Sequence, residues 1–274
     1  MHIYIRDNMD LYKIIHSGQC FRAAEIENNL YRFITGRHIL YISPIHGIRY
    51  DVSCSRYQWN HVWKPYFDLS SNYRKLEEAL KMDNSYLARA AEYSQGIHIL
   101  RQDPWETLIT FIISQRKSIP AIQTSVEKLC RSCGEKIKTS KETIYTFPTA
   151  AALSRLTMED LKACSLGYRA SYIYKTARAI QKRPHLMKDM ATMNDETLIE
   201  TLMKLPGVGI KVASCTALFG FHRTAMAPVD VWIQRVIDQY YGGINPFPHY
   251  GKVAGIIQQY LFYYAQSTGM KNIP

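Results

Sequence analysis

A lysine at the predicted start of a helix is the residue of this sequence best placed for covalent chemistry. Lys211 follows the run Pro-Gly-Val-Gly-Ile at residues 206–210 and falls in the first turn of the helix expected there. A cation at this position opposes the helix dipole, and an amine whose charged form is disfavoured is a better nucleophile. The alternative is a lysine that binds phosphate or is simply solvated, and position alone favours that alternative.

An aspartate precedes another predicted helix. Asp230 follows Ala-Pro-Val and comes directly before a segment of helical periodicity, where its carboxylate is expected to accept backbone N–H groups as an N-cap. Those hydrogen bonds also hold the carboxylate ionised, so it could face a cation that develops in a transition state. A lysine and an aspartate at two such helix starts permit imine chemistry at a sugar carbon without requiring it.

The turn before Lys211 joins two predicted helix faces. Apolar residues recur at helical spacing from Leu198, and a second stripe begins at Val212. The two glycines permit positive φ and close backbone approach, and Val208 can fill the gap between the helices. The first N–H groups of the second helix then form an anion site suited to a phosphate. An ordinary helical connection is the alternative, and the net charge of the chain favours DNA.

The composition is that of a folded, basic protein. Of 274 residues, 47% are hydrophobic and 21% are charged, which argues against disorder. Lys and Arg number 34 against 23 Asp and Glu, so the formal net charge is +11, and 20 residues are Tyr. A basic, Tyr-rich chain suggests a polyanion whose bases stack on aromatic rings. No apolar run approaches the roughly 18 residues of a membrane span and no leader is visible, so we expect an intracellular protein without a membrane partner.

The cysteines do not suggest a metal site. Six are scattered along the chain, and only Cys130 and Cys133 lie close together. No second pair and no histidine cluster stands at zinc-ligand spacing, so we expect free thiols. No cysteine follows Cys215, which excludes a four-cysteine iron–sulfur cluster near the C-terminus.

The first third of the chain differs from the rest. Short segments rich in Tyr, Ile, Phe and Val, separated by Gly, Asn or Pro, predict an antiparallel sheet at residues 20–27, 30–35, 38–42 and 48–52. Residues 72–93 then show helical character. From about residue 100 we expect helices throughout, beginning with Asp103 as an N-cap ahead of Pro104. The predicted fold class is α+β, with a sheet module at 1–96 and an all-helical module at 97–274.

Further helices are expected from apolar stripes and a cap. The pattern Thr157-Met-Glu-Asp160 resembles a capping box with Asp in place of Glu. Apolar residues recur at helical spacing in three more segments, at residues 172–180, 233–241 and 253–264.

The lysine hairpin and the downstream run Ala-Pro-Val-Asp230 together resemble the helix-hairpin-helix, Gly-Pro-Asp-type DNA glycosylases. Three further segments resemble the 8-oxoguanine DNA glycosylase branch: Ser-Gly-Gln-Cys-Phe-Arg at 17–22, Leu-Arg-Gln-Asp-Pro-Trp-Glu at 100–106, and Leu-Gly-Tyr-Arg-Ala at 166–170. The likeness runs in family order through nearly the whole chain. It implies double-stranded DNA containing 8-oxoguanine as the partner, a monomer, no cofactor, no catalytic metal and, in a prokaryote, a nucleoid-associated cytoplasmic location.

The resemblance assigns the reaction to two residues. In that family the damaged nucleotide is flipped out of the duplex, because its glycosidic bond is unreachable within the stack. A lysine attacks C1′ as the base leaves, and the resulting Schiff base drives strand cleavage by β-elimination. Lys211 matches that lysine, and Asp230 matches the aspartate that stabilises the oxocarbenium-like state.

The resemblance also assigns residues that recognise the damaged base. Oxidised guanine carries a proton on N7, so a single backbone carbonyl favours it over guanine, which has only an acceptor there. Gly18 matches the glycine that supplies this carbonyl. Cys215 matches a cysteine that stacks on the lesion, although a buried core thiol is the alternative; Gln266 matches a glutamine that reads the Watson–Crick edge. Met270 stands in place of a lesion-stacking Phe and would be a softer apolar cover.

Several positions are expected to contact DNA, and some depart from the family pattern. The implied DNA-binding residues are Tyr168 as an aromatic wedge, Arg169, Arg116, and the hairpin residues Gly207, Val208 and Gly209. In the eukaryotic enzymes an Asn and two Arg hold the opposite cytosine. Here Arg116 replaces the Asn, Ala121 replaces one Arg, and only Arg169 matches, so the sequence predicts weak discrimination over the opposite base. Trp232 replaces a phosphate-gripping His.

Two other functions remain open from the sequence. A glycosylase for another lesion, such as an alkylated purine, often has the aspartate without the lysine, so Lys211 speaks against it. A non-catalytic hairpin module would bind duplex DNA with a steep salt dependence and would have no reason to combine the lysine with Asp230.

Overall fold

The computed structural model describes residues 1–81 and 85–270, which form two compact units. The first unit contains residues 1–34, 38–101 and the C-terminal part from His222; the second contains residues 35–37 and 102–221. This grouping differs from the sequence division at residue 96, because the C-terminal helices pack in the same unit as the N-terminal sheet. The division at residue 96 stays a prediction about the modules of the sequence.

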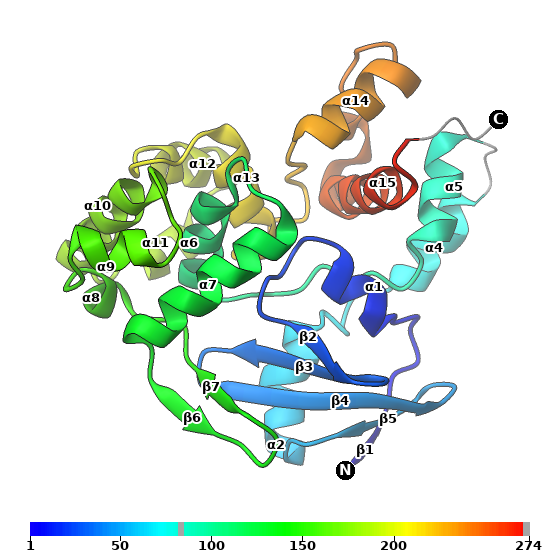
Figure 1. Cartoon of the computed structure of the whole chain (residues 1–274). Coiled ribbons are helices and arrows are strands. Elements are labelled where there is room, and N and C mark those ends of the chain that lie inside the picture. The colour runs from blue at the N-terminus through cyan, green and yellow to red at the C-terminus, as the bar shows by residue number, and fades with distance from the viewer. Residues whose placement is uncertain (82–84, 271–274) are drawn as a thin grey trace. The chain divides into compact units, whose positions relative to one another are not determined.

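The first unit is built on an antiparallel sheet of five strands (Figure 1). The strands lie in the order β1-β5-β4-β3-β2, with bounds His2–Tyr4 (β1), Ala24–Glu27 (β2), Leu30–Thr35 (β3), His38–His46 (β4) and Arg49–Val52 (β5). The prediction of an antiparallel sheet is confirmed. The segment 20–27 is extended only in its second half, because Cys20 to Ala23 are buried in the connection from α1 (Leu11–His16).

One sheet face covers an aromatic core. Along β5 the buried residues alternate with exposed ones, so Tyr50 and Val52 point inward. The short helix α2 (Arg56–Gln58) leads into the π-helical turn η1 (Trp59–Trp63) and α3 (Lys64–Tyr66), which add Trp59, Tyr66 and the fully buried Trp63 to the same core.

The remaining helices of the first unit form a second core. They are α4 (Tyr73–Leu80), α5 (Tyr86–Tyr93), α14 (Val231–Tyr240), the 3-10 helix η2 (Phe247–Val253) and α15 (Ala254–Thr268). The segment 72–93 was expected to be helical, and it forms two helices, with residues 82–84 outside the described part. The stripe expected from Val253 starts one residue later as an α-helix, because Val253 ends the 3-10 helix.

The second unit is mainly helical. Its helices are α6 (Pro104–Ser114), α7 (Ile119–Cys133), α8 (Ala150–Leu153), α9 (Met158–Ala163), α10 (Arg169–Lys182), α11 (Leu186–Thr192), α12 (Asp195–Met203) and α13 (Ile210–Phe219). Both expected caps are present: Asp103 accepts from the Glu106 N–H at 2.8 Å, and Thr157 forms a capping box with Asp160.

One part of the second unit corrects the expectation of helices throughout. Strands β6 (Lys136–Lys138) and β7 (Thr143–Tyr145) pair as an antiparallel hairpin. Three-residue strands are too short to show an alternating pattern, so hydrophobic periodicity could not reveal this hairpin. Gly134 lets the chain enter this hairpin, because a Cβ there would lie 2.1 Å from the Thr146 carbonyl oxygen.

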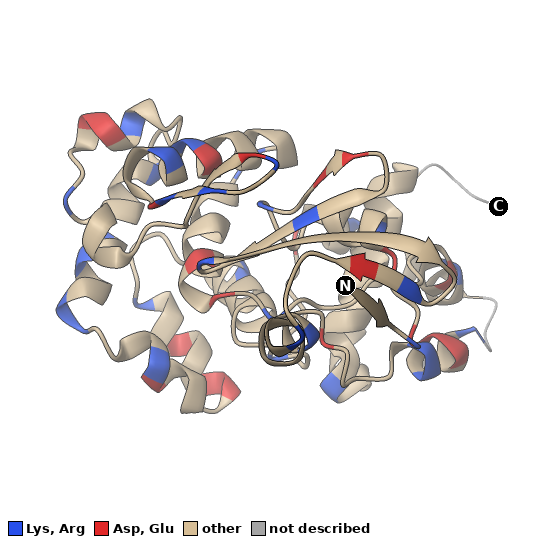
Figure 2. Cartoon of the chain, turned by 90° about the horizontal axis from the view of Figure 1, so that it is seen from below, with Lys and Arg blue, Asp and Glu red and all other residues tan. Residues whose placement is uncertain are grey.

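Cationic side chains are spread over the described residues (Figure 2). Lys and Arg occur along both units (Figure 2). None of the helices in the described part of the chain combines the length and apolar character of a membrane span.

Candidate active site

The connection between α12 and α13 is a tight hairpin whose shape depends on one glycine. Gly207 has φ of 77°, and a Cβ at this position would lie 2.5 Å from the Tyr172 ring. Gly209 has φ of −92°, and a Cβ added there would meet no atom within 4 Å. The expected positive φ therefore holds only at Gly207 of the two. Val208 is buried, which agrees with the prediction that it fills the gap between the helices.

The side chain of the residue that follows α6 and one side chain of α10 fix this hairpin. The Gln115 amide donates to the Gly207 carbonyl at 3.0 Å, and the Thr176 hydroxyl donates to the Pro206 carbonyl at 3.0 Å. Gly209 is the N-cap of α13 and supplies no side-chain cap. The first N–H groups of α13 therefore face outward from a turn without side chains at its cap, which is the geometry of an anion site.

Lys211 lies in the first turn of α13, as expected. Its side chain is half-buried, and its Nζ lies 5.3 Å from the centre of the Phe111 ring. Phe111 in turn stacks on Phe219, so an aromatic pair supports the amine. Cys215, one helical turn after Lys211, is buried.

Asp230 is the N-cap of α14 in the first unit. Its Oδ1 accepts from the Ile233 N–H at 2.9 Å, which confirms the predicted cap, and the side chain is half-buried. A carboxylate held by a helix N-terminus is stabilised as an anion. Lys211 belongs to the second unit.

The loop that carries Gly18 is held by glutamine side chains. Gly18 has φ of 74°, which favours glycine at this position. Gln19 donates to the Ser17 hydroxyl at 3.0 Å and to the His98 carbonyl at 2.9 Å, and Gln259 from α15 donates to the Ser17 carbonyl. These contacts fix the backbone on both sides of Gly18.

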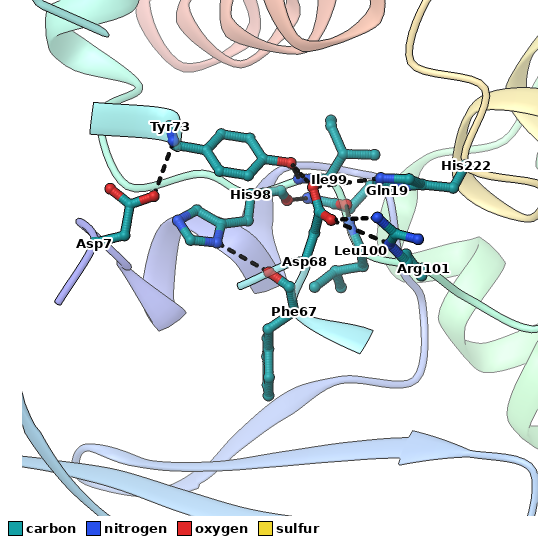
Figure 3. Close-up of polar contacts among 10 residues, drawn as sticks. All are labelled: Asp7, Gln19, Phe67, Asp68, Tyr73, His98, Ile99, Leu100, Arg101 and His222. Carbon is teal, nitrogen blue, oxygen red and sulfur yellow. Dashed lines mark hydrogen bonds and ion pairs between the residues drawn. The ribbon is translucent and has the colours of Figure 1, made fainter. Parts of the chain in front are cut away.

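Near this loop, the buried carboxylate of Asp68 contacts Arg101 and His222, two residues at which chain segments of the first unit end or begin (Figure 3). Asp68 is 1% exposed; it accepts from Arg101 at 2.7 Å and from the Tyr73 hydroxyl at 2.9 Å, and it pairs with His222 at 3.3 Å. Arg101 ends one segment of the unit, and His222 begins the segment that leads to Asp230.

The charge of Asp68 is stabilised by these partners. Burial raises the pKa of the carboxyl, but hydrogen bonds from His222 and Arg101 outweigh it and lower the pKa from 3.8 to about 2. Gln19 joins the same network, since its carbonyl oxygen accepts from the Leu100 N–H at 2.8 Å. The Asp68 network therefore positions both the Gly18 loop and the start of the segment that leads to Asp230. Sequence reasoning missed it because its members are far apart in the chain.

The expected DNA-contacting residues of the second unit differ in exposure. Tyr168 is 53% exposed, and the Arg169 guanidinium lies 4.4 Å from its ring centre. Arg169 itself is only 6% exposed, and its Nε donates to the Gln115 carbonyl at 2.9 Å. Arg116 is exposed with φ of 51°. An aromatic wedge at Tyr168 fits this exposure, whereas the Arg169 guanidinium is turned inward.

The neighbouring Lys117 was not singled out from the sequence. Its Nζ donates to the Ser125 hydroxyl and the Ser165 carbonyl, and burial together with nearby Arg169 lowers its pKa. Sequence spacing gave no signal for this lysine, because its partners come from two distant segments.

The remaining base-recognition candidates lie at the end of the first unit. Gln266 is half-buried on α15, and Met270 packs against the helical core of that unit. All six cysteines are free thiols. In residues 1–81 and 85–270, no three His, Cys, Asp or Glu side chains gather as a metal site.

The matches to family models cover almost all of the chain. Residues 109–261 match the HhH-GPD superfamily base excision DNA repair protein, which places the hairpin and Asp230 in that class. Residues 3–108 match the 8-oxoguanine DNA glycosylase N-terminal domain. The chain belongs to the 8-oxoguanine DNA glycosylase family of the HhH-GPD superfamily.

Individual relatives agree with this assignment. A probable N-glycosylase/DNA lyase of Methanothermobacter thermautotrophicus is 30% identical over 233 residues, covering 74% of this chain and 72% of the relative. The N-glycosylase/DNA lyase of Saccharomyces cerevisiae is 36% identical over 187 residues, and the match spans half of that longer protein.

A solved structure matches over almost the whole length of both chains. The 8-oxoguanine glycosylase/lyase of Clostridium acetobutylicum, solved with double-stranded DNA containing cytosine opposite 8-oxoguanine, has a TM-score of 0.90 and 30% identity, covering 98% of this chain and 99% of that one. The predicted fold class, a sheet module with a helical glycosylase module, is confirmed.

Proposed function

We propose that this chain binds duplex DNA and excises 8-oxoguanine as a bifunctional DNA glycosylase and AP lyase in base excision repair. Family membership over almost the whole chain supports the activity. The observation that carries the proposal is the amine of Lys211 in the first turn after an uncapped Gly-Val-Gly hairpin. Monomeric state and a cytoplasmic, nucleoid-associated location stay predictions.

Lys211 is the proposed nucleophile. Its neutral amine attacks C1′, the glycosidic bond breaks, and the bonding electrons leave with the base. Loss of the amine proton and opening of the sugar ring give a Schiff base between Nζ and C1′. Loss of a C2′ proton then expels the 3′ phosphate, which completes the lyase step.

Asp230 is the proposed electrostatic partner of this reaction. Its carboxylate is held by the N-terminus of α14, so it is fixed before substrate arrives. A fixed anion stabilises positive charge that develops on the sugar as the base departs, without a reorganisation cost at that moment.

Lesion recognition is proposed for the carbonyl of Gly18. An acceptor there pairs with the N7 proton of 8-oxoguanine. Guanine has no proton on N7, so the carbonyl would be left unpaired, and the binding free energies of the two bases would differ by about 1–3 kcal/mol. The hydrogen bonds of Gln19 and Gln259 support this role, because they hold the loop in one conformation. Cys215, Gln266 and Met270 are proposed to complete the base pocket.

Weak discrimination over the opposite base is also proposed. The methyl side chain of Ala121 cannot donate a hydrogen bond, and Arg116 replaces an amide side chain. The inward hydrogen bonds of Arg169 further support the proposal, since they occupy donors that a cytosine would otherwise use.

Borohydride trapping tests the proposed chemistry. Wild-type protein with an 8-oxoguanine duplex is expected to form a covalent DNA adduct, and Lys211→Gln is expected to abolish it while retaining duplex binding. Lys204→Gln, an exposed lysine before the hairpin, is the control and should still trap. A Lys211→Gln variant that still traps would show that another amine is the nucleophile.

A further inference from the structure

A basic cavity lies in the first unit outside the proposed catalytic machinery. It has a volume of about 650 Å³ and is lined by β1, by the α2–α3 region and by the start of α4. Four cationic side chains line it: Arg6, Arg56, Lys64 and Arg74. Within the unit, β1 and α2 lie at the end opposite α14, whose N-cap is Asp230 (Figure 1).

The positive charge of this cavity is poorly balanced. Asp7 is the single carboxylate of the lining, and it already accepts the N–H groups of Tyr73 and Arg74 at the start of α4. Arg74 also contacts Glu78 at 3.1 Å. Among the described residues, neither Arg6, Arg56 nor Lys64 forms an ion pair with the protein. Three exposed cations thus line the cavity without an ion-pair partner in residues 1–81 and 85–270, which favours an anionic ligand.

One wall of the cavity is the free edge of the sheet. β1 is an edge strand, and it pairs only with β5, through Met1, Ile3 and Ile5. In an antiparallel ladder the intervening residues, His2 and Tyr4, direct their N–H and C=O groups away from the partner strand. An exposed edge of this kind is a template for an added strand.

The two features fit one kind of ligand. Edge N–H and C=O groups are spaced for an extended polypeptide, and the surrounding cations would pair with its carboxylates. The buried Trp59 and the half-buried Leu69 give the cavity an apolar floor between the cations. We infer that this cavity docks an extended acidic segment of a partner protein, in which acidic and apolar residues alternate, as an added strand beside β1.

This ligand is favoured over DNA by the shape of the site. A sugar-phosphate backbone offers no N–H donor for the outward carbonyls of the edge strand, and a rigid duplex does not enter a cavity of this size. The inference does not rest on the proposed chemistry, because no residue of the cavity belongs to the candidate active site.

Fluorescence anisotropy with the full-length protein tests the inference. The probe is a labelled nine-residue peptide of alternating Glu and Val, compared with the same peptide carrying Lys for Glu; a labelled 8-oxoguanine duplex is measured in parallel. We expect the acidic peptide to bind the wild-type protein. The Arg56→Glu/Lys64→Glu variant should bind this peptide about tenfold or more weakly. Its affinity for the duplex should stay within about twofold of that of a Lys182→Glu/Lys188→Glu control. That control changes the net charge equally and should keep peptide binding.

A second variant tests the edge strand separately from charge. Tyr4→Pro removes an outward N–H and should lower the affinity for the acidic peptide, whereas Tyr4→Ala keeps this N–H and should not lower that affinity. Excision activity of each variant reports that it is folded. The inference is overturned if the acidic peptide binds no better than its Lys counterpart, or if both charge-reversed proteins lose it equally. It is also overturned if duplex binding falls with the cavity variant alone, which would assign the site to DNA, or if that variant abolishes self-association, which would assign it to a second copy.

Discussion

The hairpin of the second unit and the Asp68 network of the first are built in opposite ways. The hairpin is four consecutive residues, and its proposed anion site is made of backbone groups left uncapped by Gly209. The network gathers side chains of Gln19, Asp68, Arg101 and His222 from distant segments. Local sequence therefore defines the hairpin and its proposed nucleophile, whereas long-range packing fixes the backbone of the Gly18 loop in the first unit.

The largest stability effect is expected at the hairpin. Gly207→Ala places a Cβ 2.5 Å from the Tyr172 ring at a positive φ, and we expect a loss of about 2–3 kcal/mol in the free energy of unfolding. Gly209→Ala meets open space at an ordinary φ and should change it by less than about 1 kcal/mol. Urea denaturation measures both, and equal losses would show that the hairpin does not depend on Gly207.

The network is expected to give the next largest effect. Asp68→Asn removes the negative charge that pairs with Arg101 and His222, and it should lower the free energy of unfolding by about 2 kcal/mol at neutral pH. Because the network fixes the Gly18 loop, the selectivity for 8-oxoguanine over guanine in excision should fall as well. Lys75→Gln, an exposed lysine of the same unit, is the control. Unchanged selectivity in a folded Asp68→Asn protein would show that the network does not contribute to recognition of 8-oxoguanine.

The same carboxylate predicts a pH dependence of stability. Its pKa is about 2 in the folded protein, below the ordinary 3.8, so its contribution is complete above about pH 5 and is lost as pH falls towards 2. The difference in unfolding free energy between wild type and Asp68→Asn should therefore shrink between pH 5 and pH 3. A difference that stays constant over that range would contradict the assignment of the ion pairs.

The sequence predicted one of these two regions and missed the other. Lys211, Val208 and the Asp230 cap follow from helix periodicity and capping rules, which act over a few residues. The ionic partners of Asp68, Arg101 and His222, lie 33 and more positions away, and no local pattern links them to it. For the same reason Gln115 was not recognised as a residue that holds the hairpin, although its neighbour Arg116 was singled out.

The smallest effect concerns the opposite base. With Ala121 and an inward Arg169, excision of 8-oxoguanine opposite adenine should approach that opposite cytosine, within about tenfold in single-turnover rates, which corresponds to about 1.4 kcal/mol. Ala121→Arg should raise the preference for cytosine. A cytosine preference of about a hundredfold in the wild type would contradict this proposal.

Peptide mapping of the trapped adduct tests the central claim most directly. Trypsin cannot cleave after a modified Lys211, so the reduced DNA remnant should appear on one peptide that runs from Leu205 to Arg223. Mass spectrometry that finds the remnant on this peptide, at Nζ of Lys211, is the predicted result. A remnant on any other lysine or on the amino terminus would show that the hairpin lysine is not the nucleophile.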